Sequence, residues 1–167
     1  MSDKVTFNEE RFSQSDEISR EATRKLYKKI KPKWILEDNP NRYGVDFIVR
    51  DSSGKIIAYI ECELSNTGFL EGSFKYPEIR LVSRKNHFLR GLDANERTVL
   101  SHPIYICTID KELKGAVIYS TNDMMFYGRL EEGCRNYIPN QGYVSEDMWC
   151  LNINYCKTFD LVQTVRT

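Results

Sequence analysis

The most constraining feature of this chain is a pair of apolar segments separated by a short polar break. The stretch YGVDFIVRDSSGKIIAYIECEL spans residues 43–64, and Asp-Ser-Ser-Gly occupies residues 51–54 within it. Small polar residues and glycine at such a break are typical of a tight turn. The two segments are therefore predicted to pair as an antiparallel β-hairpin, in which alternate side chains point to opposite faces.

Three carboxylates are expected to converge on this hairpin. Glu61 and Glu63 are two residues apart, so the second strand places them on one face. Asp46 interrupts the apolar residues of the first strand and can lie near them across the hairpin. Like charges this close repel by several kcal/mol unless a cation neutralises them or the pKa of one group rises, and grouped carboxylate oxygens suit Mg²⁺ or Mn²⁺. The alternative is an ordinary solvent-facing Glu-x-Glu pair on an edge strand.

The hairpin is preceded by a predicted amphipathic helix over residues 15–30. Its apolar positions recur every four residues and form one stripe that is expected to be buried: Ile18, Ala22, Leu26 and Ile30. Pro32 is expected to end the helix, and residues 34–37 are predicted to form a short strand. Residues 1–14 show no sustained periodicity and are expected to be a loose N-terminal arm or a short capping element.

The second half of the chain alternates between candidate strands and short helices or turns. The expected elements are a loop over 66–75, a short apolar run and a basic turn or helix over 76–92, strands over 103–110 and 115–120, a short helix over 121–129, and a strand with a closing segment over 148–162. The length of 167 residues suits one core. We therefore expect a single α/β domain, with a central mixed sheet flanked by helices.

Composition excludes some classes of protein and leaves others open. The 24 acidic and 24 basic side chains balance, so any binding of nucleic acid must come from local patches rather than from net charge. The five cysteines contain no CxxC pair, which argues against a disulfide framework or a zinc knuckle. No apolar stretch approaches the roughly 20 residues of a membrane span, and no signal peptide is evident, so a cytoplasmic protein is expected.

The order of these motifs resembles the core of the PD-(D/E)xK nuclease superfamily, which includes restriction endonucleases and archaeal Holliday-junction resolvases. The resemblance covers residues 17–64 and rests on a helix with a glutamate, Gly-Val-Asp-Phe-Ile and Tyr-Ile-Glu-Cys-Glu. It implies a restriction-endonuclease-like core with Asp46 and Glu61 as ligands of Mg²⁺ or Mn²⁺, and Glu21, or else Glu17, as the helix carboxylate. The implied activity is metal-dependent hydrolysis of phosphodiester bonds, with DNA as the expected partner and a homodimer as a common state.

One departure from the family concerns the residue that is usually lysine. This chain has Glu63 there, and a glutamate at that place can accept a proton from water or join the metal shell. Lys85, in the segment SRKNHFL, could supply the cationic group from a neighbouring element, as displaced lysines do in relatives. The alternative for Lys85 is a solvated basic turn. The predicted catalytic set is Glu21, Asp46, Glu61, Glu63 and Lys85.

Two basic patches could contact phosphates. One lies at the end of the predicted helix and includes Lys28 and Lys29; the other comprises Arg80, Arg84, Lys85 and His87. Lysines at the end of a helix are also explained by solvation and the helix dipole. A second functional hypothesis therefore remains: a catalytically inactive nuclease-like module that binds nucleic acid or a protein partner, for which Glu63 in place of lysine is an argument.

Overall fold

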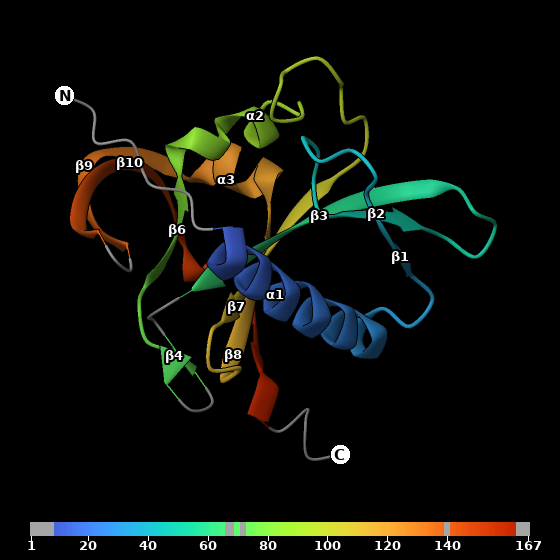
Figure 1. The fold of residues 1–167 in the computed structure, drawn as a ribbon, viewed down its shortest axis with the longest axis horizontal. Coiled ribbons are helices and arrows are strands. Elements are labelled where there is room, and N and C mark those ends of the chain that lie inside the picture. Colours follow the sequence, from blue (N-terminus) through green and yellow to red (C-terminus); the bar gives the residue numbers. More distant parts are fainter. Residues whose placement is uncertain (1–8, 66–68, 71–72, 139–140, 163–167) are drawn as a thin grey trace.

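The computed structural model describes residues 9–65, 69–70, 73–138 and 141–162. Six strands form its largest sheet: β1 (Ile35–Asp38), β2 (Phe47–Arg50), β3 (Ile56–Ser65), β7 (Ile104–Asp110), β8 (Gly115–Ser120) and β11 (Lys157–Asp160). Their order is β1-β2-β3-β7-β8-β11, as Figure 1 shows. Only β3 and β7 pair in parallel, and the other neighbours are antiparallel. The predicted α/β fold with a mixed sheet is confirmed at this level.

The predicted hairpin and its turn are confirmed. β2 and β3 pair antiparallel, and the turn between them is closed by Asp51, whose carboxylate accepts hydrogen bonds from the backbone N–H groups of Ser53 (2.9 Å) and Lys55 (3.0 Å). Gly54 has a φ of +87°, a conformation that residues with a Cβ rarely adopt. The conformation of this turn is therefore determined by hydrogen bonds and a glycine within the turn itself.

One face of the sheet is covered by α1 (Glu9–Ile30), which packs on β3 and β7 (Figure 1). The helix ends before Pro32 as predicted, but it begins at Glu9, so the expected loose arm is wrong for residues 9–14. Residues 1–8 lie outside the described part of the chain. The expected stripe is also wrong at Ile18, which is 43% exposed. Ser19 and Thr23 are buried instead, because each hydroxyl donates to a backbone carbonyl within the helix and needs no water.

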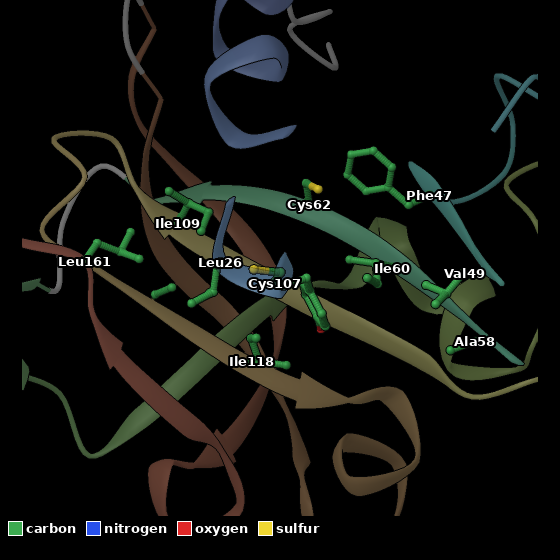
Figure 2. Close-up of a cluster of buried hydrophobic side chains, with 12 residues drawn as sticks. Leu26, Phe47, Val49, Ala58, Ile60, Cys62, Cys107, Ile109, Ile118 and Leu161 are labelled. Carbon is green, nitrogen blue, oxygen red and sulfur yellow. The ribbon is translucent and has the colours of Figure 1, made fainter. Parts of the chain in front are cut away.

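The space between α1 and the sheet holds the larger hydrophobic cluster (Figure 2). Leu26 of α1 lies there with side chains from four strands, which include Phe47, Ile60, Cys107 and Ile118. Cys62 belongs to the same cluster and is a buried, free thiol. Burial raises the pKa of the Cys107 thiol to about 12, as expected for an unreactive core cysteine.

The opposite face of the sheet is covered mainly by a second sheet, which corrects the expectation of helices on both sides. Its strands are β6 (Glu78–Val82), β9 (Arg129–Ile138) and β10 (Gly142–Asn152), in the order β6-β10-β9. Ile79 and Leu151 of this sheet pack against Ile106 and Val117 of the large one. The short helices α2 (Asn86–Leu89) and α3 (Thr121–Tyr127) complete the cover, and α3 confirms the helix predicted after residue 120.

The long connection from β3 to β7 brings residues that are distant in the sequence close to β3. It contains β4 (Phe69–Leu70), β5 (Ser73–Phe74), β6, η1 (Ser83–Lys85) and α2. A parallel pair such as β3 and β7 requires a long connection of this kind. The remaining 3₁₀ helix, η2 (Ile153–Tyr155), precedes β11. Within the described residues, no helix combines the length and the apolar character that a membrane crossing requires.

Candidate functional site

Glu61 and Glu63 point away from α1, on the face of β3 that looks toward the second sheet. Their neighbours Ile60 and Cys62 belong to the cluster under α1, and alternation along a strand sends the glutamates to the other side. The predicted common face of the two glutamates is therefore observed. The Glu61 side chain is only 11% exposed, whereas that of Glu63 is 27% exposed. A carboxylate as deeply buried as Glu61 needs a partner.

Lys85 is that partner, and it comes from η1 in the connection between β3 and β7. Its ammonium Nζ lies 2.9 Å from Oε1 of Glu61 and also contacts Oε1 of Glu63. The Lys85 side chain is 25% exposed, so it does not lie in a freely solvated turn. The structure thus brings together three of the predicted site residues, Glu61, Glu63 and Lys85, although Lys85 follows the two glutamates by 24 and 22 positions in the sequence.

The charges of this cluster are strongly coupled. Burial raises the pKa of Glu61 to about 8; the negative charges of Asp46 and Glu63 add to this effect, and Lys85 opposes it. Burial alone would lower the pKa of Lys85, but the charges of Glu63 and Glu61 raise it overall. Lys85 therefore remains a cation at neutral pH, while Glu61 is the carboxyl group whose ionisation is most costly.

Asp46 lies immediately before β2, not within the strand as predicted, because β2 begins at Phe47. Phe47 packs under α1, whereas Val45 packs on the other side of the sheet with Tyr59 and Phe88. The chain therefore turns at Asp46, whose carboxylate is held by two donors. Oδ2 accepts a hydrogen bond from the backbone N–H of Cys62 at 2.7 Å, and Oδ1 accepts one from Nη2 of Arg20 at 2.8 Å.

Arg20 of α1 is a site residue that the sequence did not indicate. Besides Asp46, its guanidinium lies 2.9 Å from a carboxylate oxygen of Asp16 and 3.2 Å from one of Asp38. Burial raises the pKa of Asp16, Arg20 opposes the shift, and the charge of Asp46 adds to it. The only signal in the sequence is the four-residue spacing of Asp16, Arg20 and Arg24, which also describes an ordinary salt-bridged helix face.

Glu21, the predicted helix carboxylate, does not join the cluster. Its side chain is 61% exposed and forms an ion pair with Lys25 at 3.2 Å, one turn further along the helix. Glu17 is exposed as well. The helix carboxylate near Asp46 is instead Asp16, because the buried stripe of α1 follows Ser19 and Thr23 and not Ile18.

Tyr119 of β8 is a second residue that sequence reasoning missed. Glu61, Ile106 and Tyr119 are neighbours across β3, β7 and β8, so the three side chains share one face. The Tyr119 hydroxyl is buried and has no hydrogen-bond partner among the described residues. Burial raises its pKa, and the charges of Glu63 and Glu61 add to the shift. A tyrosine in an apolar strand is ordinarily a core residue, so the sequence carries no signal for this position.

A bound divalent cation requires several oxygen donors from the protein, from water or from substrate. Across the described ranges, no group of three or more His, Cys, Asp or Glu side chains is arranged to hold a metal ion. Mg²⁺, however, is commonly held by one or two carboxylates together with water and phosphate oxygens. Asp46 and Glu61 are the two hard oxygen donors that the resemblance assigns to an ion, and the charge of Asp46 adds to the raised pKa of Glu61. Arg20 of α1 holds Asp46, and Lys85 meets Glu61 on the face of β3 away from α1, so each carboxylate would have to exchange a cationic partner for the ion.

The predicted phosphate-binding residues lie at several places. Lys28 and Lys29 are exposed near the end of α1, about 12 Å along the helix from Arg20. Arg80 is exposed on β6, and Arg84 of η1 pairs with Glu146 at 3.5 Å.

His87 differs from these residues. Its ring packs edge-on against Phe88, with centroids 4.1 Å apart, and its Nε2 atom is buried without a hydrogen-bond partner in the described part of the chain. Burial lowers the pKa of His87, and the charge of Lys85 lowers it further. A neutral imidazole with a covered nitrogen is poorly suited to the predicted phosphate contact. The environment of His87 therefore argues against a phosphate contact.

Comparison with known proteins gave no match, since no family model, no curated protein and no solved structure is similar to this chain. The resemblance to PD-(D/E)xK nucleases therefore rests on the motifs in the sequence.

Proposed function

We propose that this protein is a divalent-metal-dependent endonuclease with a restriction-endonuclease-like core, and that it hydrolyses phosphodiester bonds in DNA. The observation that carries the proposal is the meeting of Lys85 with Glu61 and Glu63, close to Asp46. The resemblance calls for an aspartate, an acidic residue and a lysine. Here the lysine arrives from η1, because Glu63 occupies its usual place. The observed order of α1 and the β2–β3 hairpin agrees with the same resemblance.

Each residue has a defined part in this proposal. Asp46 and Glu61 would hold the ion, and Mg²⁺ or Mn²⁺ would polarise the scissile phosphate and lower the pKa of a bound water. Glu63 forms an ion pair with Lys85 and would accept a proton from the attacking water. Arg20 orients the Asp46 carboxylate from the helix side. Arg20 and the ion would compete for the same carboxylate oxygen.

A second candidate function is favoured by a specific observation. Every carboxylate of the cluster already has a cationic partner within the chain, Arg20 for Asp46 and Lys85 for both glutamates. Such internal compensation would suit a nuclease-like module that binds nucleic acid or a protein partner without cleaving. The two candidates predict different effects of added metal. A nuclease should bind the ion, whereas a non-cleaving module should be unaffected by it.

The proposed function is tested by a cleavage assay with purified protein. Linear, nicked and four-way DNA and a matched RNA are incubated with Mg²⁺, with Mn²⁺ or with EDTA. The wild type is expected to cut at least one DNA only when metal is present. Asp46→Asn and Glu61→Gln, which remove the two proposed metal ligands, should lower the rate about 100-fold or more. Lys85→Met removes the displaced lysine and should also lower the cleavage rate.

Glu21→Gln is the matched control, because it removes a carboxylate from α1 that lies outside the cluster. It should cut at the wild-type rate. A folded wild type that cuts none of these substrates with either metal would contradict the proposal and leave the non-cleaving module as the better account. Cleavage of RNA alone would correct the substrate while keeping the site.

A further inference from the structure

Asp46 ends a loop that is closed on itself. The backbone N–H of Asn39 donates to the carbonyl of Asp46 at 3.0 Å, and the side-chain amide of Asn39 donates to the carbonyl of Val45 at 2.9 Å. Inside the loop, a turn is closed by a hydrogen bond from Gly44 N–H to the carbonyl of Asn41 at 3.0 Å. Residues 39–46 therefore hold a defined shape beside the candidate site.

A second loop, residues 91–98, is fixed against the first one. The backbone N–H of Ala94 donates to the carbonyl of Tyr43 at 2.6 Å, and the side-chain amide of Asn41 donates to Asp93 at 3.3 Å. Asp93 is fully buried and also accepts from the backbone N–H groups of Arg97 (3.1 Å) and Thr98 (3.2 Å). Figure 1 shows the connection between β1 and β2 beside the connection that follows α2.

This double loop presents one aromatic ring and two arginines to solvent. Tyr43 is 43% exposed, and Arg42 and Arg97 are exposed as well. The guanidinium of Arg42 lies 4.9 Å from the Tyr43 ring centroid, and its Nη2 donates to the Tyr43 hydroxyl at 2.7 Å. Within the described residues, neither Arg42 nor Arg97 has a carboxylate at ion-pair distance. Both positive charges are therefore available to an anionic ligand.

Tyr43 and Arg42 lie close to Asp46 because they are near it in the chain. Asp46 follows Tyr43 by three positions along the chain, which limits their Cα–Cα distance to about 11 Å. Arg42 is one residue further away, at no more than about 14 Å. One short segment of nucleic acid can therefore reach both Asp46 and the double loop.

We infer that Arg42, Tyr43 and Arg97 bind a nucleic acid at an unpaired nucleotide next to the bond that is cut, with its base stacked on Tyr43 and its phosphates on the arginines. The location of the cut rests on the proposed function, but the binding does not. An aromatic ring is a stacking platform for a base that has left its own stack, and arginines bind phosphates on either side. The substrate class is therefore nucleic acid with a single-stranded or frayed segment, rather than intact duplex.

The inference is tested by binding in EDTA, so that cleavage plays no part. Fluorescence anisotropy compares a blunt DNA duplex with the same duplex carrying a single-stranded overhang. The wild type is expected to bind the overhang roughly tenfold more tightly or better. Tyr43→Ala should abolish that preference, and Tyr43→Phe, which keeps the ring, should retain it. Arg42→Ala and Arg97→Ala should each reduce the salt slope of binding by about 1.

Tyr155→Ala is the matched control, because Tyr155 is another exposed tyrosine, stacked on Tyr127 near α3. It should bind like the wild type. Circular dichroism and the melting temperature show that each variant is folded. Equal wild-type affinity for the two duplexes, or an unchanged preference in folded Tyr43→Ala, would overturn the inference. If the wild type cleaves DNA but gives either of these binding results, the proposed function stands and the inference fails. If the wild type prefers the overhang but cleaves with no metal, the inference stands and the proposed function is contradicted.

Discussion

At the scale of single residues, Glu61 has the most unusual environment. It is a carboxyl group on the inner face of a central strand, and its pKa of about 8 results from burial before any other cause. Lys85 reduces the cost of its ionisation but does not remove it, because the same ammonium also serves Glu63. A carboxyl group whose pKa is higher in the folded than in the unfolded protein takes up a proton on folding. The free energy of unfolding therefore depends on pH.

The first prediction concerns that dependence in metal-free buffer. The folded pKa of Glu61 is raised from 4.5 to about 8. Its contribution to the free energy of unfolding is therefore fully present at acidic pH and is lost as pH rises through about 8. Denaturant unfolding in EDTA should show the wild type losing up to a few kcal/mol between about pH 5 and pH 9, and Glu61→Gln losing much less. Parallel curves for the two proteins would contradict the assigned pKa.

At the scale of elements, α1 is joined to the β1–β2 side of the sheet by two arginines that differ in burial. Arg20 meets the half-buried Asp46, whereas Arg24 meets the exposed Asp38 at 2.6 Å. Both guanidinium groups also lie over the Phe47 ring, at 5.5 Å and 5.0 Å from its centroid. The two residues thus form a natural pair for comparison, since they share the ring contact and the contact with Asp38, and Arg20 also pairs with Asp46.

The second prediction uses that pair. Arg20→Ala should lower the free energy of unfolding by about 1–3 kcal/mol, because it leaves Asp46 without its cationic partner. Arg24→Ala, the control, should cost less than about 1 kcal/mol. Added Mg²⁺ should stabilise Arg20→Ala more than it stabilises the wild type, because the ion no longer competes with Arg20 for Asp46. Equal effects of metal on both proteins, measured by thermal unfolding, would argue against that competition.

The elements also show what the sequence can and cannot predict. The hairpin was predictable because alternation and the Asp-Ser-Ser-Gly turn act over a few residues, and the common face of Glu61 and Glu63 follows from the same alternation. The turn of the chain at Asp46 was not predictable, because it depends on packing of Val45 and Phe47 on opposite sides of the sheet. The buried face of α1 was misjudged because hydroxyl groups bonded within the helix occupy it instead of Ile18.

At the scale of the whole molecule, the six-stranded sheet has a helix on one face and a second sheet on the other. The second sheet holds Lys85 in place, because η1 continues directly from β6. This sheet was only partly predicted. β9 reads RLEEGCRNYI, which has no apolar alternation and contains a glycine, and its pairing with β10 is a tertiary property. The candidate site therefore depends on a part of the fold that local patterns do not reveal.

The third prediction tests the contact between the two sheets. Leu151 of β10 is fully buried against the large sheet. Leu151→Ala should lower the free energy of unfolding by about 2–5 kcal/mol, through lost burial and the cavity that it leaves. Val99→Ala is the control, because Val99 is 71% exposed, and it should change stability by no more than about 0.5 kcal/mol. Similar losses in the two variants would mean that the second sheet does not pack as described.

The central claim is that Asp46 and Glu61 together hold a divalent cation. Mn²⁺ titration followed by electron paramagnetic resonance counts free and bound ions directly, without a substrate. The wild type is expected to bind Mn²⁺, and Asp46→Asn and Glu61→Gln are each expected to lose that binding while Glu21→Gln keeps it. A wild type that binds no Mn²⁺, or binding that survives in Asp46→Asn and Glu61→Gln, would contradict the account.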